Sequence, residues 1–318
     1  MKTIKAIGVT AVLGMTGSLV QAADVVVGVP GWPSAAATAH ILKVVMEENL
    51  GLEVTTQSGS NAVIWEAMDR GSMHIHPEVW LPNQGNFHKK YVDENGTVVQ
   101  NKNGVKAIQG ICMTKEMSEK YDITSIYDLT DPDKSVLFDT NGDGMGEMWI
   151  GQPAAASTIV ERVKAKSYGY DQTMELIELD TVLNWAALDS AVKEERPYAF
   201  FCYAPHHVFN IYDLVVLEEP PHDADTWKIV QPTDDPAWLE KSNADSAWDS
   251  ANLYVHYSKS LEKDQPNAAN LLKNFKLNAD LVGQLSYSVV VEKKSPEEVA
   301  SEWVKNHSDL VESWLVGQ

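Results

Sequence analysis

Segments with the pattern of buried strands alternate with helical segments over residues 24–84. DVVVGVPGW at residues 24–32 has the apolar run and sharp turn of a buried strand, and strand patterns recur at residues 52–58 and 73–84. Helical spacing with a serine cap and a closing glycine fills residues 34–51 and 60–71. Strands joined by helices predict a parallel sheet, in which ligands lie beyond the carboxyl ends of the strands.

A second unit of the same kind follows along the chain. Residues 105–114 predict a strand that leaves the first unit, and an almost wholly apolar strand at residues 198–207 is expected at the centre of the second unit. We therefore expect an α/β protein with two lobes, each a mainly parallel sheet flanked by helices. Lobe 1 comprises residues 23–110 and 214–318, and the inserted lobe 2 comprises residues 111–213. Two connections, near Ile111 and Leu214, would form a hinge.

Further helices are expected in both units. The sequence Gly151-Gln152-Pro153 predicts a helix start with Pro153 in its first turn, continuing over residues 157–168. A threonine-capped helix is expected at residues 181–197. The C-terminal part is expected to be largely helical, with helices near residues 244–257, 266–274, 279–291 and 296–315.

The N-terminus has the pattern of an export signal. Two lysines precede a short apolar stretch, and Val20-Gln21-Ala22 fits a cleavage site after Ala22, so residues 1–22 are interpreted as a signal peptide. The apolar stretch is too short for a good membrane anchor. The 318 residues carry a formal net charge of -20 and no basic patch, which argues against nucleic acid as a partner.

The chain has two cysteines, Cys112 and Cys202. Export permits a disulfide between them, and two buried free thiols are the alternative. Both cysteines lie in predicted strands near the lobe junction, where neighbouring antiparallel strands would bring the sulfurs together.

Four of the ten tryptophans fall at strand ends, turns or helix starts. Trp32 and Trp80 belong to the first unit, and Trp149 and Trp185 to the second. Aromatic faces attract a cation that has no hydrogen-bond donors, such as a methylated ammonium group. Packing is the alternative role for each ring. Glu78, two residues before Trp80, and Tyr203, beside His206 and His207, are further candidates for ligand contact.

The segment DTNGDGMGE resembles the start of a calcium loop. Oxygen ligands would come from Asp139, Asn141, Asp143, the Met145 carbonyl group and Glu147. The twelfth position is Ile150, where the helix–loop–helix motif requires a glutamate, so a further carboxylate or water would have to complete the site. An Asx-rich turn without an ion is the alternative. We expect a structural Ca²⁺ ion here.

The sequence gives no positive sign of catalysis. It has no Gly-x-Ser-x-Gly motif, phosphate loop or evident nucleophile–base pair, and we expect a protein that is not an enzyme. Two other classes stay open: an exported metal-dependent enzyme that uses His74 and His76, and a structural calcium protein whose tryptophans only pack.

Several of these stretches resemble one family. The tryptophan after the first strand, SNAVIWEAMDRG, HPEVWLPNQ and MWIGQP are similar to the glycine betaine/proline betaine type of substrate-binding proteins of ABC importers. The calcium-like loop and the extra tryptophans look most like the trimethylamine N-oxide-binding branch, in which four tryptophans surround the ligand. By position, these would be Trp32, Trp80, Trp149 and Trp185, with the last placed by its helix-start position.

The resemblance implies a type II-like periplasmic binding protein that acts as a monomer with a membrane permease. Its ligand would be a small trimethylated amine held between the lobes. A betaine brings a carboxylate, for which the helix N-terminus after Gly151 could offer donors. No arginine lies near the four tryptophans in sequence, which favours a ligand without a carboxylate. Glycine betaine or choline stays the alternative.

Overall fold

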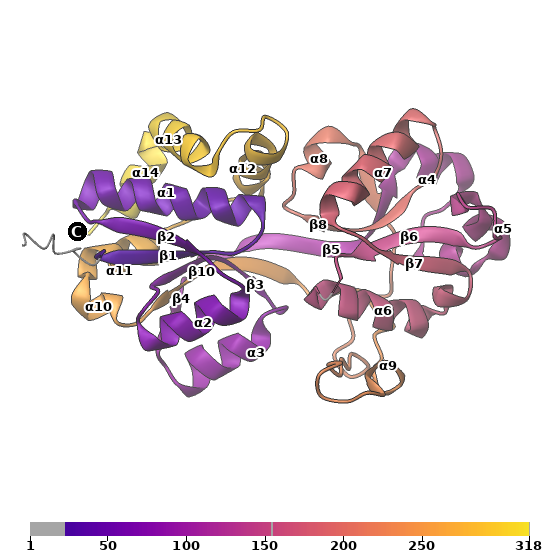
Figure 1. Ribbon diagram of the computed structural model, residues 1–318, viewed down its shortest axis with the longest axis horizontal. Helices are drawn as coiled ribbons and strands as arrows, with labels where there is room; N and C mark the ends of the chain where they lie inside the picture. Colours follow the sequence, from indigo (N-terminus) through magenta and orange to yellow (C-terminus); the bar gives the residue numbers. More distant parts are fainter. Residues whose placement is uncertain (1–22, 154, 318) are drawn as a thin grey trace, which may run out of the picture.

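The computed structural model describes residues 23–153 and 155–317, which form two lobes on one continuous sheet (Figure 1). The expected signal peptide lies outside the described residues. In the described part of the chain, the sheet has ten strands, in the order β2-β1-β3-β10-β5-β8-β6-β7, with β4 beside β10 and β9 beside β5. The expected two-lobe α/β architecture is confirmed.

Lobe 1 is a sheet with a core on each face. The parallel strands β1, β2 and β3 are continued by β10, which is antiparallel to β3. One face is covered by α1, α12, α13 and α14, and the other by α2 and α3 (Figure 1). The elements of lobe 1 are β1 (Val25–Val29), α1 (Pro33–Leu50), β2 (Val54–Ser58), α2 (Asn61–Arg70), β3 (Ile75–Leu81), α3 (Gly85–His88), η1 (Lys89–Glu94), β4 (Val98–Gln100), β10 (Ala251–Ser258), α10 (Leu261–Asp264), α11 (Pro266–Asn274), α12 (Ala279–Val290), α13 (Pro296–Asn306) and α14 (Ser308–Trp314).

Lobe 2 is built around a shorter sheet. Strands β6, β7 and β8 are parallel to one another, and β5 is antiparallel to β8. Helices α7 and α8 lie on one face and α6 on the other (Figure 1). The elements of lobe 2 are β5 (Val105–Thr114), α4 (Lys115–Tyr121), η2 (Ile126–Thr130), α5 (Pro132–Ser135), η3 (Val136–Phe138), β6 (Gly146–Gly151), α6 (Ala156–Tyr168), η4 (Tyr170–Gln172), β7 (Met174–Glu178), α7 (Thr181–Lys193), β8 (Ala199–Ala204), α8 (Val208–Ile211), β9 (Leu214–Val216) and α9 (Trp238–Lys241).

Two chain crossings lie side by side at the lobe junction. Strand β5 pairs with β10 of lobe 1 up to Ala107 and with β8 of lobe 2 from Ile108 onward. The return crossing leads into Ala251, which pairs with Ala107. The expected boundary at residue 111 is thus a few residues late, because the junction falls within β5 itself.

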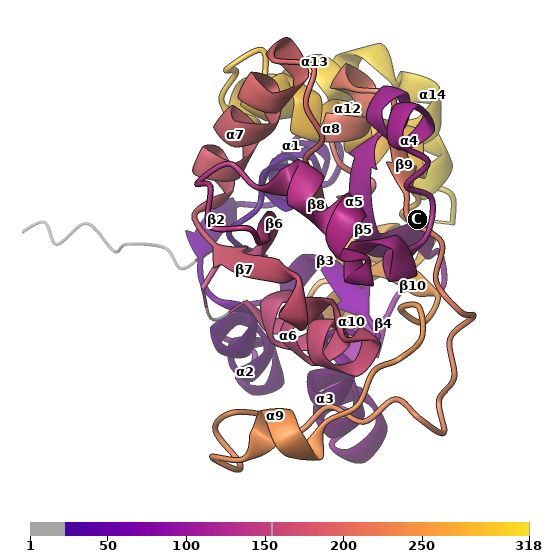
Figure 2. The ribbon, with the colours of Figure 1, turned by 90° about the vertical axis from the view of Figure 1, so that its right-hand side faces the viewer.

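The expected second boundary at Leu214 is wrong by a larger margin. Residues 214–217 pair with β5 or pack in the core of lobe 2, and Trp248 still packs against that core. The segment between β9 and β10, which includes α9, runs below α6 before the chain returns to lobe 1 (Figures 1 and 2). Residues 214–250 therefore belong with lobe 2.

The helix expected near residues 244–257 is absent from the structure, which has the strand β10 there. The sequence ANLYVHYS is rich in aromatic and β-branched residues, which favour strands. One edge of β10 pairs with β3 and the other with β5 and β4, so the strand is fully hydrogen-bonded in the sheet. Long-range pairing therefore decides this segment.

Some helix ends follow the capping signals in the sequence, and others do not. Ser60 caps α2, and Gly51 and Gly71 close α1 and α2 in the left-handed conformation, as expected. Helix α1, however, begins at Pro33 with Trp32 as its cap, and the Ser34 side chain donates to Glu78 instead of capping the helix. Helix α7 is capped by Asp180 and not by a threonine.

Helix α6 also begins later than expected. Its first residue is Ala156 and Ala155 is its cap, so Pro153 precedes the helix instead of lying in its first turn. The Thr158 hydroxyl group donates to the Gln152 carbonyl oxygen at 2.7 Å and ties the preceding loop to the helix.

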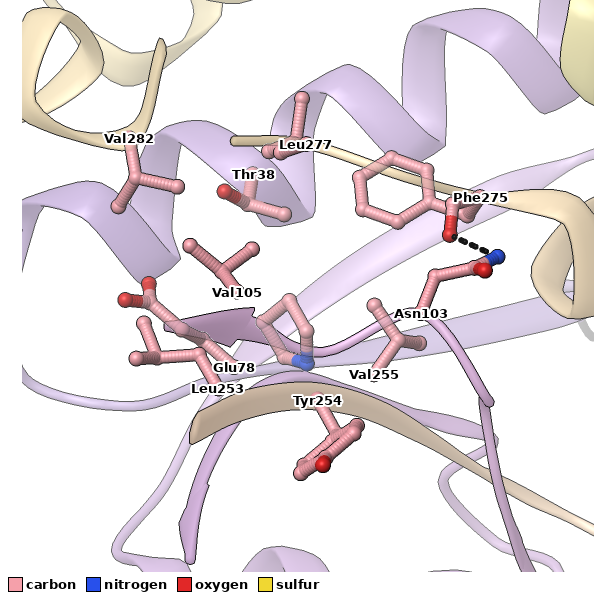
Figure 3. A pocket seen from close by; sticks show the side chains of 11 residues that line it. Thr38, Glu78, Asn103, Val105, Leu253, Tyr254, Val255, Phe275, Leu277 and Val282 are labelled. Carbon is pink, nitrogen blue, oxygen red and sulfur yellow. Dashed lines mark hydrogen bonds between the residues drawn. The ribbon is translucent and has the colours of Figure 1, made fainter. Parts of the chain in front are cut away.

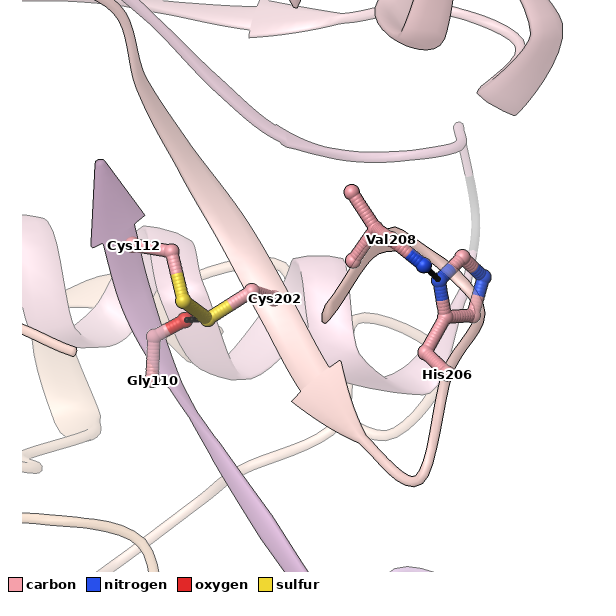
Figure 4. The surroundings of a disulfide bond; sticks show 5 residues. All are labelled: Gly110, Cys112, Cys202, His206 and Val208. Carbon is pink, nitrogen blue, oxygen red and sulfur yellow. Dashed lines mark hydrogen bonds between the residues drawn. A yellow bond between two sulfur atoms is a disulfide. The ribbon is translucent and has the colours of Figure 1, made fainter. Parts of the chain in front are cut away.

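A disulfide joins Cys112 of β5 to Cys202 of β8 (Figure 4). The two strands are antiparallel, and Gly110 lies opposite Cys202, so the cysteines occupy diagonal positions with Cα atoms 5.7 Å apart. Both are buried in the core of lobe 2. Of the two alternatives that the sequence left open, the disulfide is the one present, within lobe 2 and close to the junction.

Candidate functional site at the lobe junction

An aromatic contact links the two lobes. Trp80, near the end of β3 in lobe 1, packs edge-on against Tyr203 of β8 in lobe 2, with ring centroids 5.3 Å apart. Both side chains are partly exposed. Two predicted site residues from opposite lobes therefore meet directly.

The aromatic contacts continue into lobe 2 through His206. Its ring centroid lies 4.7 Å from that of Tyr203 and 5.0 Å from that of Trp185. Trp185, in α7, lies 5.9 Å from Trp149, near the end of β6. Trp149 is 4% exposed, and its indole N–H donates to the Leu179 carbonyl oxygen at 3.0 Å. We call the rings of Trp80, Tyr203, His206, Trp185 and Trp149 the junction aromatic chain.

Trp32 lies beside this chain on the lobe 1 side. It follows β1 and caps α1, so its backbone is extended. Its ring centroid is 6.2 Å from that of His76. Among the described residues, the buried Trp32 indole N–H has no hydrogen-bond partner, yet it is close enough to Glu78 to lower the pKa of that carboxyl group.

Glu78 is a buried carboxyl group that forms no ion pair with any of the residues that the structure describes. It is 3% exposed and accepts hydrogen bonds from the Ser34 hydroxyl group at 3.0 and 2.9 Å. A small cavity of about 20 Å³ borders it, lined mainly by apolar side chains such as Val105, Leu253 and Val282 (Figure 3). Burial raises the pKa of Glu78 to about 8, whereas the Ser34 hydrogen bonds act in the opposite direction.

Glu78 is thus predominantly protonated at neutral pH. Burial, and secondarily the negative charge that Glu78 acquires at alkaline pH, raises the pKa of the Tyr203 phenol above its usual value. These effects place Glu78 near Tyr203, and Trp32 near Glu78. The other four predicted ligand contacts are joined by ring contacts through His206.

His206 is the member that sequence reasoning placed only at a cleft edge. Strand β8 ends at Ala204, and His206 lies in the turn that leads into α8. Its Nδ1 atom accepts a hydrogen bond from the Val208 backbone N–H at 3.3 Å (Figure 4). Burial, and then the adjacent His207, lowers the pKa of His206 well below its usual value. Neutral His206 therefore carries its proton on Nε2. The only sequence signal was its position beside Tyr203.

The calcium-like loop connects η3 to β6. Asp139 accepts hydrogen bonds from the backbone N–H groups of Asn141, Gly142 and Gly144, and the bonds from the two glycines hold the pKa of Asp139 below its usual value. Asn141 and Asp143 form similar turns, and Glu147 accepts from the Thr140 N–H. These contacts are those of the Asx-rich turn.

The loop does not by itself present a complete metal site. Within residues 23–153 and 155–317, no group of three or more His, Cys, Asp or Glu side chains is arranged to hold a metal ion. Asp139, Asn141, Asp143 and Met145 nevertheless lie on one loop, and Glu147 follows them at the start of β6. Calcium binding there stays a prediction.

A family model for the substrate-binding domain of ABC-type glycine betaine transport systems matches residues 23–306. The chain belongs to this family. Its match covers both lobes, including the junction aromatic chain and the return crossing. In the part of the chain that the structure describes, no helix is both long and apolar enough to cross a membrane.

Two relatives of this chain are named as binding proteins, one for betaines and one for trimethylamine N-oxide. It is 24% identical over 220 residues to the glycine betaine/proline betaine-binding periplasmic protein of Salmonella typhimurium, and that match covers 66% of this chain and 64% of the relative. The chain thus spans about two thirds of that relative's length. It is 22% identical over 311 residues to the trimethylamine N-oxide-binding protein of Pelagibacter ubique, covering 96% and 94% of the two chains.

Solved structures of two binding proteins share the fold. Lactococcal OpuAC, in its closed conformation complexed with glycine betaine, aligns with a TM-score of 0.67 at 24% identity, covering 92% of this chain and 98% of the other. A choline-binding protein of an ABC transporter, in complex with choline, aligns with a TM-score of 0.67 at 16% identity and covers 92% of each chain. At these identities, the likeness concerns the fold.

Proposed function

We propose that this protein is the substrate-binding protein of an ABC importer and that it captures trimethylamine N-oxide or a related trimethylammonium compound between its lobes. The observation that carries the proposal is the junction aromatic chain, which connects tryptophans of both lobes through Tyr203 and His206. Family membership supports transport over the alternative of a metal-dependent enzyme.

Aromatic faces supply the affinity for such a ligand. Each face contributes about 0.5–2 kcal/mol toward a methylated ammonium group, and more where water is excluded. A micromolar dissociation constant corresponds to about 8 kcal/mol of binding free energy. Three or four rings, together with apolar contacts and one hydrogen bond, provide that after the cost of ordering the ligand.

Glu78 is the proposed donor of the hydrogen bond to the ligand. A carboxyl group whose pKa is about 8 holds its proton at neutral pH and can donate it to the oxygen of an N-oxide. Trimethylamine N-oxide combines that oxygen with three methyl groups on a positive nitrogen. This combination suits a neutral acid beside aromatic faces better than a bare quaternary cation does.

Glycine betaine or choline is the second candidate, supported by the names of the Salmonella relative and of the choline complex. A betaine carboxylate would need donors, and the chain's three arginines are engaged elsewhere: Arg70 pairs with Glu66, Arg162 with Glu178 and Arg196 with Glu194. We therefore favour a ligand without a carboxylate over a betaine.

The cellular context follows from the same family. We propose a periplasmic location after signal-peptide cleavage, delivery of the ligand to a membrane permease, and action as a monomer. The Salmonella relative is named as periplasmic.

Ligand titration tests the proposal. Trimethylamine N-oxide, glycine betaine, choline and carnitine are titrated in parallel by calorimetry and tryptophan fluorescence. We expect trimethylamine N-oxide to bind most tightly. Tightest binding of glycine betaine or choline would replace it as the ligand, and no response to any of the four would leave the rings as packing.

Variants locate the site. Trp80→Ala and Trp149→Ala should each weaken binding at least tenfold, because each removes one aromatic face from a different lobe. Trp149 is buried, so Trp149→Phe and a thermal melt accompany it. Trp238→Ala on the remote helix α9 is the control and should bind as the wild type does. Wild-type affinity in the Trp80 variant removes that ring from the site.

A further inference from the structure

We propose that a second binding site, for a small methylated ammonium cation, lies between α6 and residues 222–249, and that it is separate from the junction aromatic chain. A cavity of about 250 Å³ occupies this place. None of the six predicted ligand contacts lines it. Pro82 and Asn83 line it from lobe 1, and Val160, His222, Trp227 and Trp248 are among the residues that line it from the side of lobe 2.

The cavity is lined by aromatic rings set at angles to one another. The centroids of Trp227 and Trp248 are 5.6 Å apart with planes inclined at 56°, and His222 lies 5.0 Å from Trp227 at 57°. Rings inclined in this way do not cover one another's faces as stacked rings do. Partly exposed indole faces beside a cavity are the surroundings that a methylated ammonium group favours.

Hydrogen bonds hold two of these rings in place. The Trp248 indole N–H donates to Glu161 of α6 at 2.7 Å, and His222 Nδ1 lies 2.9 Å from the Ala247 carbonyl oxygen. The backbone just before Trp248 is therefore tied to His222. A site whose walls are already ordered loses less conformational entropy when a ligand binds.

The charges around the cavity favour a cation. Asp249 lines it, and two buried glutamates, Glu161 and Glu219, lie behind Trp248. Lys164 is 5.9 Å from the Trp248 ring, but its ammonium group is 2.7 Å from Glu219 and 3.9 Å from Glu161. Because the Lys164 ammonium group is paired with these carboxylates, it does not repel a bound cation. The Asp249 carboxylate adds a negative charge at the cavity.

Size and position define the ligand further. Cavities for drug-sized ligands occupy roughly 300–1,000 Å³, so a cavity of about 250 Å³ suits a cation of only a few heavy atoms. Residues of both lobes line it, and a ligand there would contact both. The Phe201 ring, whose centroid is 6.2 Å from those of both Tyr203 and Trp248, packs between a ring of the junction aromatic chain and a ring of the cavity.

Calorimetry with tetramethylammonium chloride at low ionic strength tests this inference on the full mature chain. The wild type should bind two tetramethylammonium cations per chain. Trp227→Ala should bind one, because the affinity of the second site should fall at least tenfold. Trp238→Ala, in the same segment but outside the cavity lining, should still bind two. Asp249→Asn should weaken the second site severalfold.

The outcomes separate this inference from the proposed function. Trp80→Ala should lose the first site and keep the one that depends on Trp227. One binding event that disappears in Trp227→Ala but persists in Trp80→Ala would support the second site and count against the first. Two unchanged events in Trp227→Ala, or a single event that depends only on Trp80, would overturn the second site.

Discussion

Each lobe buries a glutamate, and the two glutamates differ in what compensates their burial. Glu78 of lobe 1 has the Ser34 hydroxyl group as its hydrogen-bond donor, and in the described ranges no lysine or arginine forms an ion pair with it. Glu161 of lobe 2 is 0% exposed, accepts from Trp248, and lies 3.9 Å from the Lys164 ammonium group. Burial raises the pKa of Glu78 to about 8 and that of Glu161 to about 7.

The difference fits the proposed ligand contact for Glu78 and a structural role for Glu161. Lys164 also pairs with Glu219, and Tyr168 donates to Glu219 at 2.9 Å, so this buried cluster fastens α6 to the segment that returns to lobe 1. Removing one partner of a buried ion pair strongly destabilises a protein, because the other charge is left buried and uncompensated. Glu78 has no such partner beside Trp32 and Tyr203, which suits a group that exchanges a hydrogen bond with a ligand.

Removal of the disulfide should have the largest effect on stability. Cys112 and Cys202 are 90 residues apart, and the chain-entropy model gives about 4–5 kcal/mol for closing such a loop. Cys112→Ala/Cys202→Ala should therefore unfold at much lower urea concentration, with nearly unchanged ligand affinity in the protein that stays folded. A loss of affinity without a loss of stability would contradict a purely structural role. Thiol counting on denatured, unreduced wild type should find no free thiol.

Lys164→Met should weaken lobe 2 almost as strongly. It leaves Glu219 buried without its cation, and breaking a buried ion pair costs about 3–5 kcal/mol. Urea denaturation at neutral pH measures the loss. Lys193→Met is the control, because Lys193 is 72% exposed and its pair with Asp189 should contribute less than about 1 kcal/mol. Equal stability of Lys164→Met and Lys193→Met would show that the buried ion pair in lobe 2 contributes no more than an exposed one.

Glu78→Gln should change the pH dependence of stability by up to a few kcal/mol. The pKa of Glu78 is raised from 4.5 to about 8 in the folded state, so the native protein binds the extra proton between these values. The stability that wild-type Glu78 provides is fully present below pH 4.5 and is lost as the pH rises through 8. The free energy of unfolding of Glu78→Gln, relative to wild type, should therefore increase between these pH values.

Ligand binding gives Glu78 a second readout. Affinity for trimethylamine N-oxide should fall in wild type as the pH rises through 8, because the carboxyl group loses the proton that it donates. The glutamine amide keeps its donor, so Glu78→Gln should bind with little dependence on pH. Calorimetry at pH 6, 7.5 and 9 compares them, and parallel curves for the two proteins would show that Glu78 does not donate to the ligand.

Calcium removal should have the smallest effect. An ion that binds only the folded loop stabilises the protein by mass action, so a chelator should lower the melting temperature by a few degrees. Asp143→Ala should abolish that sensitivity, whereas the exposed Asp225→Ala, outside the loop, should retain it. Identical melting curves with and without chelator, and no metal by elemental analysis, would assign the loop to the Asx-rich turn.

Much of the site was predictable because its residues follow short local signals. Trp32 comes three residues after the end of β1 and Trp80 lies near the end of β3, at the edge of the sheet where ligands of parallel sheets are expected. The closing glycines of α1 and α2 and the bounds of β5 were also visible, since left-handed caps and apolar runs are local features. The sequence could not place Ser34, which suits a helix cap equally well and bonds to Glu78 only because α1 packs beside β3.

The α/β alternation, the positions of most strands and helices, and the aromatic residues available for a ligand could thus all be predicted from the order of residues. Tertiary structure alone decided that residues 251–258 form a strand, because β10 gains hydrogen bonds from strands distant in sequence on both of its edges. It also decided that His206 connects Tyr203 to Trp185, and that Glu78 keeps its proton. Both depend on burial and on neighbours from other elements, which the order of residues along the chain does not specify.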